Sequence, residues 1–213
     1  MREATRIIAI RHGQTAWNAE QRMQGQLDTV LDAKGRWQAQ QLAQALAHEA
    51  VDAIVASDLS RALATAAPLA DARGLRVQRE PGLRERCFGV FEGFTYADIE
   101  RHWPDDVARW RARDPSAAPP RGERLGAFYE RCLAVADRLA LRYAGRSVIW
   151  VTHGGVLDCL HRAASRVALD APRTWTLDNA SVNRLLHGDL GLMLVGWGDV
   201  GHLSTPTVDT REA

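Results

Sequence analysis

Three short apolar runs constrain the fold of this chain more than any other feature of its sequence. They are RIIAI (Arg6–Ile10), DAIVAS (Asp52–Ser57) and SVIWV (Ser147–Val151), and β-branched residues are frequent in each. Polar residues or glycine bound every run. Runs of this length and composition are typical of strands buried on both faces of a sheet. The sequence therefore predicts a central sheet that helices cover on both sides.

Helical patterns separate these runs. Ala39, Leu42, Ala43 and Leu46 recur at helical spacing after Gly35. We expect further helices over residues 59–73, 124–143 and 154–164. Proline at position 68 predicts a kink in the first of these, or its division into two shorter helices. Alternation of strands and helices predicts an α/β fold, a three-layer α/β/α sandwich with a mostly parallel sheet.

Two further apolar segments lie near the end of the chain. SVNRLLHGD (181–189) and LGLMLVGW (190–197) predict two strands joined by a tight Gly-Asp turn, a hairpin at one edge of the sheet. The segment GWGDVG (196–201) matches the GxGxxG pattern of dinucleotide-binding loops, but no helical pattern follows it. We interpret its glycines as loop residues.

The segment from Glu85 to Gly122 interrupts the alternation. It contains tryptophans at 103 and 110 and the proline-rich run DPSAAPPRG. We expect an insertion over residues 85–122 that crosses the sheet like a cap. The whole chain, residues 1–213, is then a single domain.

The charge balance argues against a nucleic acid or a membrane surface as partner. The chain has 27 basic and 26 acidic residues, and no apolar segment approaches the length of a membrane span. Its three cysteines (87, 132 and 159) form no CxxC pair, as is usual in a reducing compartment. The apolar run near the N-terminus is too short for a signal peptide. We expect a cytoplasmic protein that binds a small molecule and that could form a homo-oligomer.

Basic side chains follow all three predicted strands. The first strand is followed by Arg11 and His12, the second by Ser57 and Arg61, and the third by His153, Gly154 and Gly155. The carboxyl ends of parallel strands meet at one sheet edge, where open α/β sheets bind their ligands. A helix N-terminus at the same edge also favours an anion. Phosphate is the natural candidate, because arginine forks match its oxygens.

Several segments resemble the signatures of the histidine phosphatase superfamily, also called phosphoglycerate mutase-like. RHGQTAWN (11–18) is similar to its first motif, and RMQGQLDTVLDAKGRWQA (22–39) to the stretch that follows. SDLSRALATA (57–66) and LRERCFGVFEG (83–93) resemble its second motif and the segment that carries its acid. VTHGG (151–155) and NASVNRL (179–185) resemble its second histidine motif and a late strand. The matches cover about 180 residues in family order, and imply a phosphoglycerate mutase-like fold.

The resemblance implies a role for each matched residue. His12 would be the nucleophile that becomes phosphohistidine, and Glu85 the general acid and base. Arg11, Arg61 and His153 would surround the phosphoryl group, with Asn18 completing the pocket. Gln24, Gly25 and Gly154 would make lesser contacts with the substrate.

Such a site needs no metal and no cofactor for hydrolysis. Phosphoryl transfer requires in-line attack and neutralisation of charge on the equatorial oxygens, and two arginines supply that charge. A neutral imidazole can attack if its other ring nitrogen keeps a proton, held by a backbone carbonyl. We find no histidine or aspartate cluster at metal-ligand spacing, and Asp98 and His102 are interpreted as a surface pair.

The same pocket suits a phosphatase or a mutase. Cofactor-dependent phosphoglycerate mutases carry a longer insertion with a lysine and paired arginines, and they have HGN at the second histidine. This chain has HGG there, no lysine after Arg36 and no Arg-Arg pair. A phosphatase of small phosphate monoesters, in the phosphatase-like branch, is therefore preferred. The alternatives are a mutase that uses 2,3-bisphosphoglycerate and a catalytically silent phosphate-binding module.

The identity of the ester stays open at this stage. Sugar phosphates, phosphoglycerates and α-ribazole phosphate all fit the signatures. Aromatic residues give the insertion an apolar character. Five arginines in or beside the insertion could hold a second acid group: Arg84, Arg86, Arg109, Arg111 and Arg121.

Overall fold

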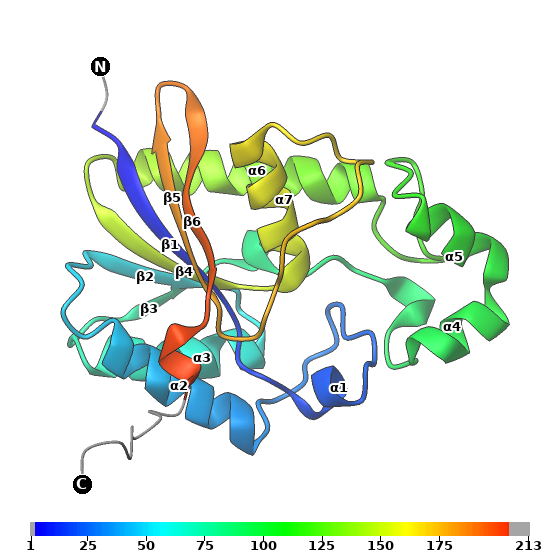
Figure 1. Cartoon of the computed structure of the whole chain (residues 1–213), viewed down its shortest axis with the longest axis horizontal. Coiled ribbons are helices and arrows are strands. Elements are labelled where there is room, and N and C mark those ends of the chain that lie inside the picture. Colours follow the sequence, from blue (N-terminus) through cyan, green and yellow to red (C-terminus); the bar gives the residue numbers. More distant parts are fainter. Residues whose placement is uncertain (1–2, 205–213) are drawn as a thin grey trace, which may run out of the picture.

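All three apolar runs form parallel strands of one six-stranded sheet (Figure 1). The computed structural model describes residues 3–204. The sheet order is β3-β2-β4-β1-β5-β6. The strand bounds are β1 (Thr5–Arg11), β2 (Ala53–Ala56), β3 (Val77–Arg79), β4 (Ser147–Thr152), β5 (Val182–Gly188) and β6 (Gly191–Asp199). Strand β1 pairs parallel to β4, and β2 pairs parallel to β4 and β3, whereas β5 is antiparallel to both of its neighbours.

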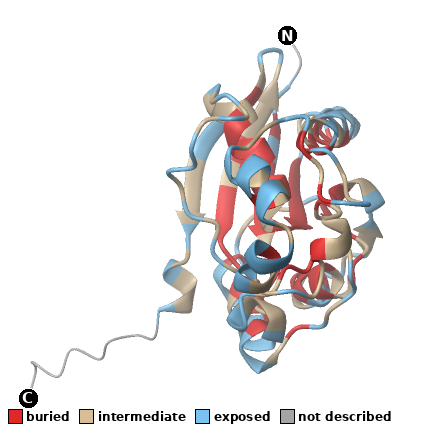
Figure 2. Cartoon of the chain, turned by 90° about the vertical axis from the view of Figure 1, so that its right-hand side faces the viewer, coloured by how far each residue is buried: buried red, intermediate tan, exposed pale blue. Residues whose placement is uncertain are grey.

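Helices cover both faces of this sheet, so the predicted three-layer α/β/α sandwich is confirmed. The main helices are α2 (Ala33–Ala45), α3 (Ser60–Asp71), α6 (Leu125–Arg142) and α7 (Gly154–Ser165). Alternate residues of β1 serve the two faces: Ile7 packs with α6 and α7, and Ile8 with α2 and α3. Figure 2 shows buried residues concentrated on the strands and on the inward faces of the helices.

Three details differ from the expectations. Strand β3 has no counterpart among the predicted strands. Helix α3 is continuous through Pro68, so it is not divided into two shorter helices. The GWGDVG glycines at 196 and 198 lie within β6 and not in a loop, because that strand extends to Asp199. At Gly198 the backbone has φ +71° and its N–H donates to Asn183 Oδ1.

The predicted hairpin lies at one edge of the sheet. Strands β5 and β6 are antiparallel, and Gly188 is in register with Gly191 across a two-residue turn of Asp189 and Leu190. Gly191 has φ +81°, a conformation that glycine adopts without strain. The hairpin is at the predicted edge, but its turn is one residue later than the predicted Gly-Asp pair, because β5 extends through Gly188.

The insertion carries two short helices of its own, α4 (Tyr96–His102) and α5 (Pro104–Arg111). Figure 1 shows them beside the end of α6 and away from the sheet. Four buried residues, Met23, Phe91, Ile99 and Val107, form an apolar cluster separate from the two clusters of the sheet. A short helix α1 (Ala16–Ala19) follows β1. These segments form the cap over the carboxyl edge of the sheet.

Candidate active site

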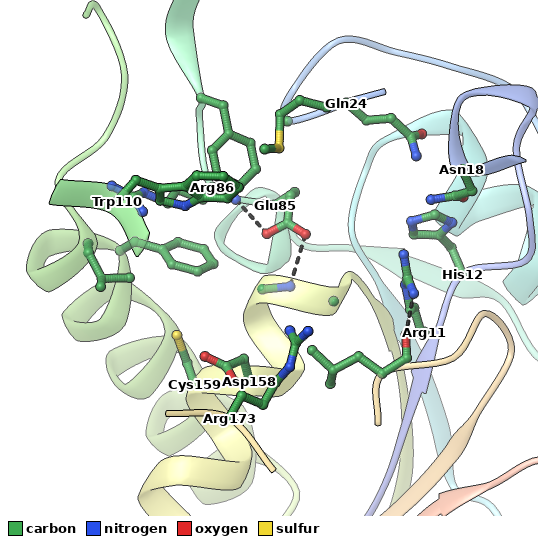
Figure 3. Close-up of a pocket in the computed structure, with 18 of the residues that line it drawn as sticks. Arg11, His12, Asn18, Gln24, Glu85, Arg86, Trp110, Asp158, Cys159 and Arg173 are labelled. Atoms are coloured by element: carbon green, nitrogen blue, oxygen red, sulfur yellow. Dashed lines mark hydrogen bonds between the residues drawn. The ribbon is translucent and has the colours of Figure 1, made fainter. Parts of the chain in front are cut away.

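A cavity of about 620 Å³ lies between the carboxyl edge of the sheet and the cap (Figure 3). It brings together eight of the nine predicted site residues, although they come from distant parts of the chain. The eight are Arg11, His12, Asn18, Gln24, Gly25, Arg61, Glu85 and Gly154. The ninth, His153, is fully buried and does not line the cavity.

His12 follows β1 and is held in one orientation. Its backbone N–H donates to the Thr152 carbonyl of β4. Its Nδ1 lies 2.7 Å from the Gly13 carbonyl oxygen. A carbonyl only accepts, so Nδ1 carries the proton and Nε2 keeps its lone pair. Burial, together with Arg61 and Arg11, lowers the pKa of His12 well below its usual value. The imidazole is therefore neutral, as a nucleophile requires.

After His12 the chain turns away from the sheet at Gly13. Glycine is needed there because the backbone of Gly35 packs closely against it, and not because of an unusual backbone angle. A Cβ atom at position 13 would lie 2.5 Å from the carbonyl oxygen of Gly35. A Cβ at position 35 would lie 2.0 Å from the carbonyl oxygen of Gln14. Two glycines thus let the chain after β1 pass against the start of α2, and this contact fixes the direction in which His12 leaves the strand.

Two arginines line the cavity beside His12: Arg61 is buried and Arg11 is half-buried. Arg61, in the first turn of α3, donates to the carbonyl oxygens of Leu27 (2.9 Å) and Gly25 (2.7 Å). Arg11 donates to the carbonyl oxygen of Leu177. Burial lowers the pKa of Arg61 to about 10 and that of Arg11 in the same direction, so both stay charged at neutral pH. The Nε atom of each is buried and has no partner among residues 3–204. Both arginines can therefore donate hydrogen bonds to the oxygens of an anion.

Asn18 and Gln24 have side-chain amides oriented by neighbouring donors. The Oδ1 of Asn18 accepts from the backbone N–H of Thr15 (3.1 Å) and from Asn179 (3.3 Å). The Oε1 of Gln24 accepts from the Thr29 hydroxyl (2.6 Å). Because the oxygens are occupied, the NH₂ group of each amide is left for another acceptor. The site thus presents neutral donors beside its two arginines.

His153 lies behind the nucleophile candidate, with the two ring centroids 5.1 Å apart. It is the residue that precedes α7, and its Nε2 lies 2.8 Å from the Ser57 hydroxyl. Its Nδ1 is buried without a partner among the described residues. Burial lowers the pKa of His153 well below the usual value, and Arg61 adds to the effect. His153 is therefore neutral, and it packs against the ring of His12 on the side away from the cavity.

Glu85 enters the cavity from the loop before the cap. Its Oε2 accepts the backbone N–H of Gly155 (2.9 Å), and its Oε1 accepts that of Arg86 (2.8 Å). A Cβ atom at position 155 would lie 2.1 Å from Glu85 Oε1. Position 155 must therefore be glycine for this carboxyl group to rest on the first turn of α7.

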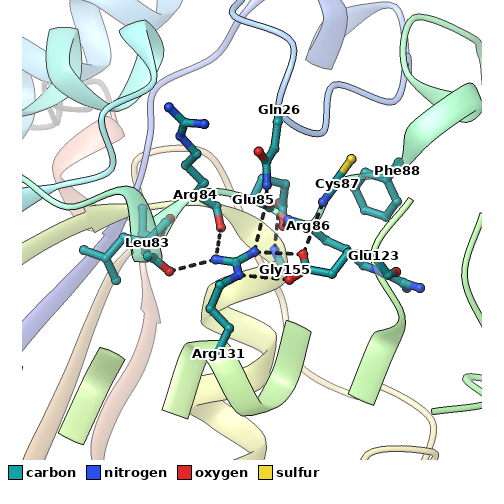
Figure 4. Close-up of polar contacts among 12 residues, drawn as sticks. Gln26, Leu83, Arg84, Glu85, Arg86, Cys87, Phe88, Glu123, Arg131 and Gly155 are labelled. Atoms are coloured by element: carbon teal, nitrogen blue, oxygen red, sulfur yellow. Dashed lines mark hydrogen bonds and ion pairs between the residues drawn. The ribbon is translucent and has the colours of Figure 1, made fainter. Parts of the chain in front are cut away.

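Arg131 of α6 holds the same loop from the other side (Figure 4). It donates to the carbonyl oxygens of Gly82 (2.7 Å), Arg84 (3.0 Å) and Glu85 (3.3 Å). It also forms an ion pair with Glu123 at 2.9 Å. Sequence patterns give no sign of this brace, because it depends on the path of the loop past α6.

The structure excludes four of the five arginines that the sequence suggested for binding a second acid group. Arg84, Arg109 and Arg111 form ion pairs with Asp58, Asp114 and Glu100, and Arg121 does not line the cavity. Only Arg86 of the five lines it, and its guanidinium donates to the carbonyl oxygens of Glu123 and Ala117.

Several residues of the cavity were not anticipated. Arg173, Trp175 and Leu177 come from the segment between α7 and β5, and Tyr96 and Trp110 from the cap. No helical or strand period marks the α7–β5 segment in the sequence, so nothing there indicated a site.

Within residues 3–204 no helix is both long and apolar enough to cross a membrane. The same residues contain no group of three or more His, Cys, Asp or Glu side chains placed to hold a metal ion.

Comparison with known proteins identifies the family to which a chain with this site belongs. The family model described as histidine phosphatase superfamily (branch 1) matches residues 7–200. The phosphoglycerate mutase-like protein 4 of Arabidopsis thaliana is 37% identical over 92% of this chain and 86% of its own length. A probable phosphoglycerate mutase GpmB of Yersinia enterocolitica is 34% identical over 95% of this chain and 97% of its own. A solved mycobacterial glucosyl-3-phosphoglycerate phosphatase, in complex with VO₃, superposes with a TM-score of 0.81 at 34% identity, covering 93% of this chain and 99% of that one.

Proposed function

This chain belongs to the histidine phosphatase superfamily (branch 1), and we propose that it is a phosphatase that hydrolyses small phosphate monoesters without a metal ion. The observation that carries the proposal is the state of His12. Its Nδ1–H is bound to the Gly13 carbonyl, and its ring is neutral. His12 lines a cavity together with Arg61, which is buried, and Arg11, which is half-buried. A buried nucleophile beside two cations suits a phosphoryl dianion.

The first step is attack of His12 Nε2 on phosphorus. An N–P bond forms as the bond to the ester oxygen breaks, and Glu85 gives its proton to the departing alkoxide. Arg11 and Arg61 neutralise the charge on the equatorial oxygens, and the NH₂ groups of Asn18 and Gln24 donate to the same oxygens. His153, neutral and packed beside His12, positions the ring.

The second step is hydrolysis of the phosphohistidine. The Glu85 carboxylate takes a proton from water, whose oxygen forms a new bond to phosphorus while the N–P bond breaks. Inorganic phosphate and neutral His12 result. The acid and base of both steps are the same group, as required when one carboxyl serves a two-step transfer.

Gly155 favours hydrolysis over the mutase reaction. Phosphoglycerate mutases of the resembling family have asparagine at this position, whereas this chain has glycine. The solved phosphatase relative supports the same choice. The names of the two curated relatives keep mutase activity, with 2,3-bisphosphoglycerate as cofactor, as the alternative.

Hydrolysis of p-nitrophenyl phosphate in the presence of EDTA tests the proposal. We expect turnover, a phosphorylated peptide that contains His12, and loss of both in His12→Ala. Absence of turnover and of the label would indicate a silent binding module. Isomerisation of 3-phosphoglycerate that depends on 2,3-bisphosphoglycerate and outpaces phosphate release would establish the mutase instead.

A further inference from the structure

The cavity carries more positive charge than a phosphate group needs. Glu85, Asp158 and Asp178 are the acidic residues that line it. Six arginines also line it: Arg11, Arg22, Arg61, Arg86, Arg113 and Arg173. With Glu85 protonated, as the proposed first step requires, the six arginines exceed the two remaining carboxylates by four charges, whereas a phosphate monoester dianion supplies two negative ones. The lining therefore has positive charge left for a further anionic group.

Five of the six arginines are bound to oxygens of the protein. Arg22 donates to Glu20 and to a backbone carbonyl, and Arg113 forms an ion pair with Asp158 at 2.6 Å. Arg11, Arg61 and Arg86 donate to backbone carbonyls as described above. Arg173 makes no hydrogen bond and no ion pair among residues 3–204, and it is exposed to the cavity. Among the six arginines that line the cavity, Arg173 is therefore the one whose guanidinium has no partner within the described residues.

Arg173 lies close to the phosphoryl site. Figure 3 shows its side chain extending from the α7–β5 segment into the cavity, on the side where Glu85 and Arg11 lie. Burial lowers the pKa of Arg11, and Arg173 is near enough to lower it further. Tyr96, the first residue of α4, lines the cavity together with both arginines. Its ring is stacked on Trp110, with centroids 5.7 Å apart. Arg173 from the α7–β5 segment and Tyr96 from the cap thus line the same cavity as Arg11, His12 and Glu85.

We propose that Arg173, assisted by the Tyr96 hydroxyl, binds a carboxylate of the substrate, so that the preferred substrates are phosphate monoesters of small hydroxy acids. The assignment rests on the phosphatase function proposed above. A carboxylate fits because Arg173 is a single unpaired guanidinium in the described part of the cavity lining, and because the two oxygens of a carboxylate match the guanidinium fork. Arg173 is then a specificity residue that takes no part in the bond-breaking steps.

A matched pair of esters tests this assignment. 3-Phosphoglycerate and glycerol 3-phosphate share the same primary phosphate and differ in a carboxylate against a hydroxymethyl group. We expect kcat/KM for phosphate release to favour 3-phosphoglycerate by about tenfold or more, the usual effect of a charge-assisted hydrogen bond. Arg173→Gln should bring the ratio close to one, Arg173→Lys should retain part of it, and Tyr96→Phe should lower it by about two- to tenfold. Both kcat/KM values of a ratio are measured on the same variant, so their ratio does not depend on the fraction of that variant that is folded.

Arg76→Gln is the charge-matched control. Arg76 is exposed, does not line the cavity, and makes no hydrogen bond or ion pair within the described residues. Its removal should leave the wild-type ratio unchanged. An equal fall in Arg76→Gln, or an unchanged ratio in Arg173→Gln, would overturn the assignment.

p-Nitrophenyl phosphate separates this inference from the proposed function. Wild-type protein that hydrolyses it but treats the two alkyl esters alike would overturn the role of Arg173 and leave the phosphatase standing. Failure to hydrolyse any of the three esters would overturn both.

Discussion

At position 155 a single methyl group decides where the Glu85 carboxyl can lie. The Cβ of an alanine there would be 2.1 Å from Oε1, whereas one at position 154 would meet nothing closer than 3.5 Å. We expect Gly155→Ala to displace Glu85 and to lower kcat/KM for an alkyl ester by about 10²-fold, the usual effect of losing a general acid. An aryl ester, whose leaving group needs less protonation, should lose less. Gly154→Ala is the comparison: it should affect both esters equally, and unequal losses there would contradict this role for Glu85.

The two buried histidines make the stability of the protein depend on pH. Burial lowers the pKa of both His12 and His153, so the unfolded chain takes up protons as the pH falls through about 6.5 while the folded chain does not. The free energy of unfolding should therefore decrease below this pH, by up to about 1.4 kcal/mol per pH unit for each histidine. Urea unfolding at pH 7.0 and 5.5 in phosphate-free buffer measures it. His153→Gln should show a smaller decrease than wild type, and equal decreases would argue against a neutral buried His153.

Helix α6 stabilises the loop that carries Glu85, and one arginine accounts for this contact. Arg131 donates to three backbone carbonyls of residues 82–85 and pairs with Glu123. We expect Arg131→Leu to lower the free energy of unfolding by about 2 kcal/mol, since it removes several charge-assisted hydrogen bonds from a partly buried group. Hydrolysis of an alkyl ester should fall more than that of an aryl ester.

Arg138 on the same helix provides the control for this contact. It pairs with Glu80, but its side chain is 53% exposed, so Arg138→Leu should change stability by less than about 1 kcal/mol. Urea unfolding of the two variants gives the comparison. Equal effects would mean that Arg131 acts only as a surface charge.

Elements with a strong period were predictable from the sequence, and the others were not. Each of β1, β2 and β4 is an apolar run that lies within two residues of its predicted bounds. Strand β3 was missed because it has only three residues and none of them is fully buried. Helices α4 and α5 do carry local signals, namely the capping box of Thr95 with Asp98 and Pro104 at the first turn.

Some residues of the candidate site could likewise be predicted from the sequence, and others could not. The phosphoryl residues lie at strand ends and in motifs, so eight of nine could be placed in one cavity. Arg173 and Arg131 could not, because their roles depend on the path of a loop and on how that loop meets a helix. A sequence shows which side chains are available, but packing decides which of them remain unpaired.

In the whole molecule the cap and the sheet have separate cores, so the contacts between them control access to the site. Arg113, just after α5, reaches across the cavity and forms an ion pair with Asp158 of α7 at 2.6 Å. It also donates to the Leu169 carbonyl (2.8 Å). Asp158 is paired in addition with the buried Arg162. Removal of Arg113 would therefore release the cap without leaving the carboxylate unpaired in the core.

Hydrogen exchange can measure this attachment of the cap. We expect Arg113→Met to raise exchange rates of α4 and α5 amides by about tenfold or more, the effect of losing a partly buried ion pair, while β1 and β4 amides keep theirs. Arg101→Met should not change exchange in either part, because Arg101 pairs within residues 3–204 only with Asp98 on its own helix and is 69% exposed. Unchanged rates in the Arg113 variant would mean that the apolar cluster around Phe91 and Ile99 holds the cap alone. Faster exchange in the cap and the sheet together would mean that the two cores unfold as one unit.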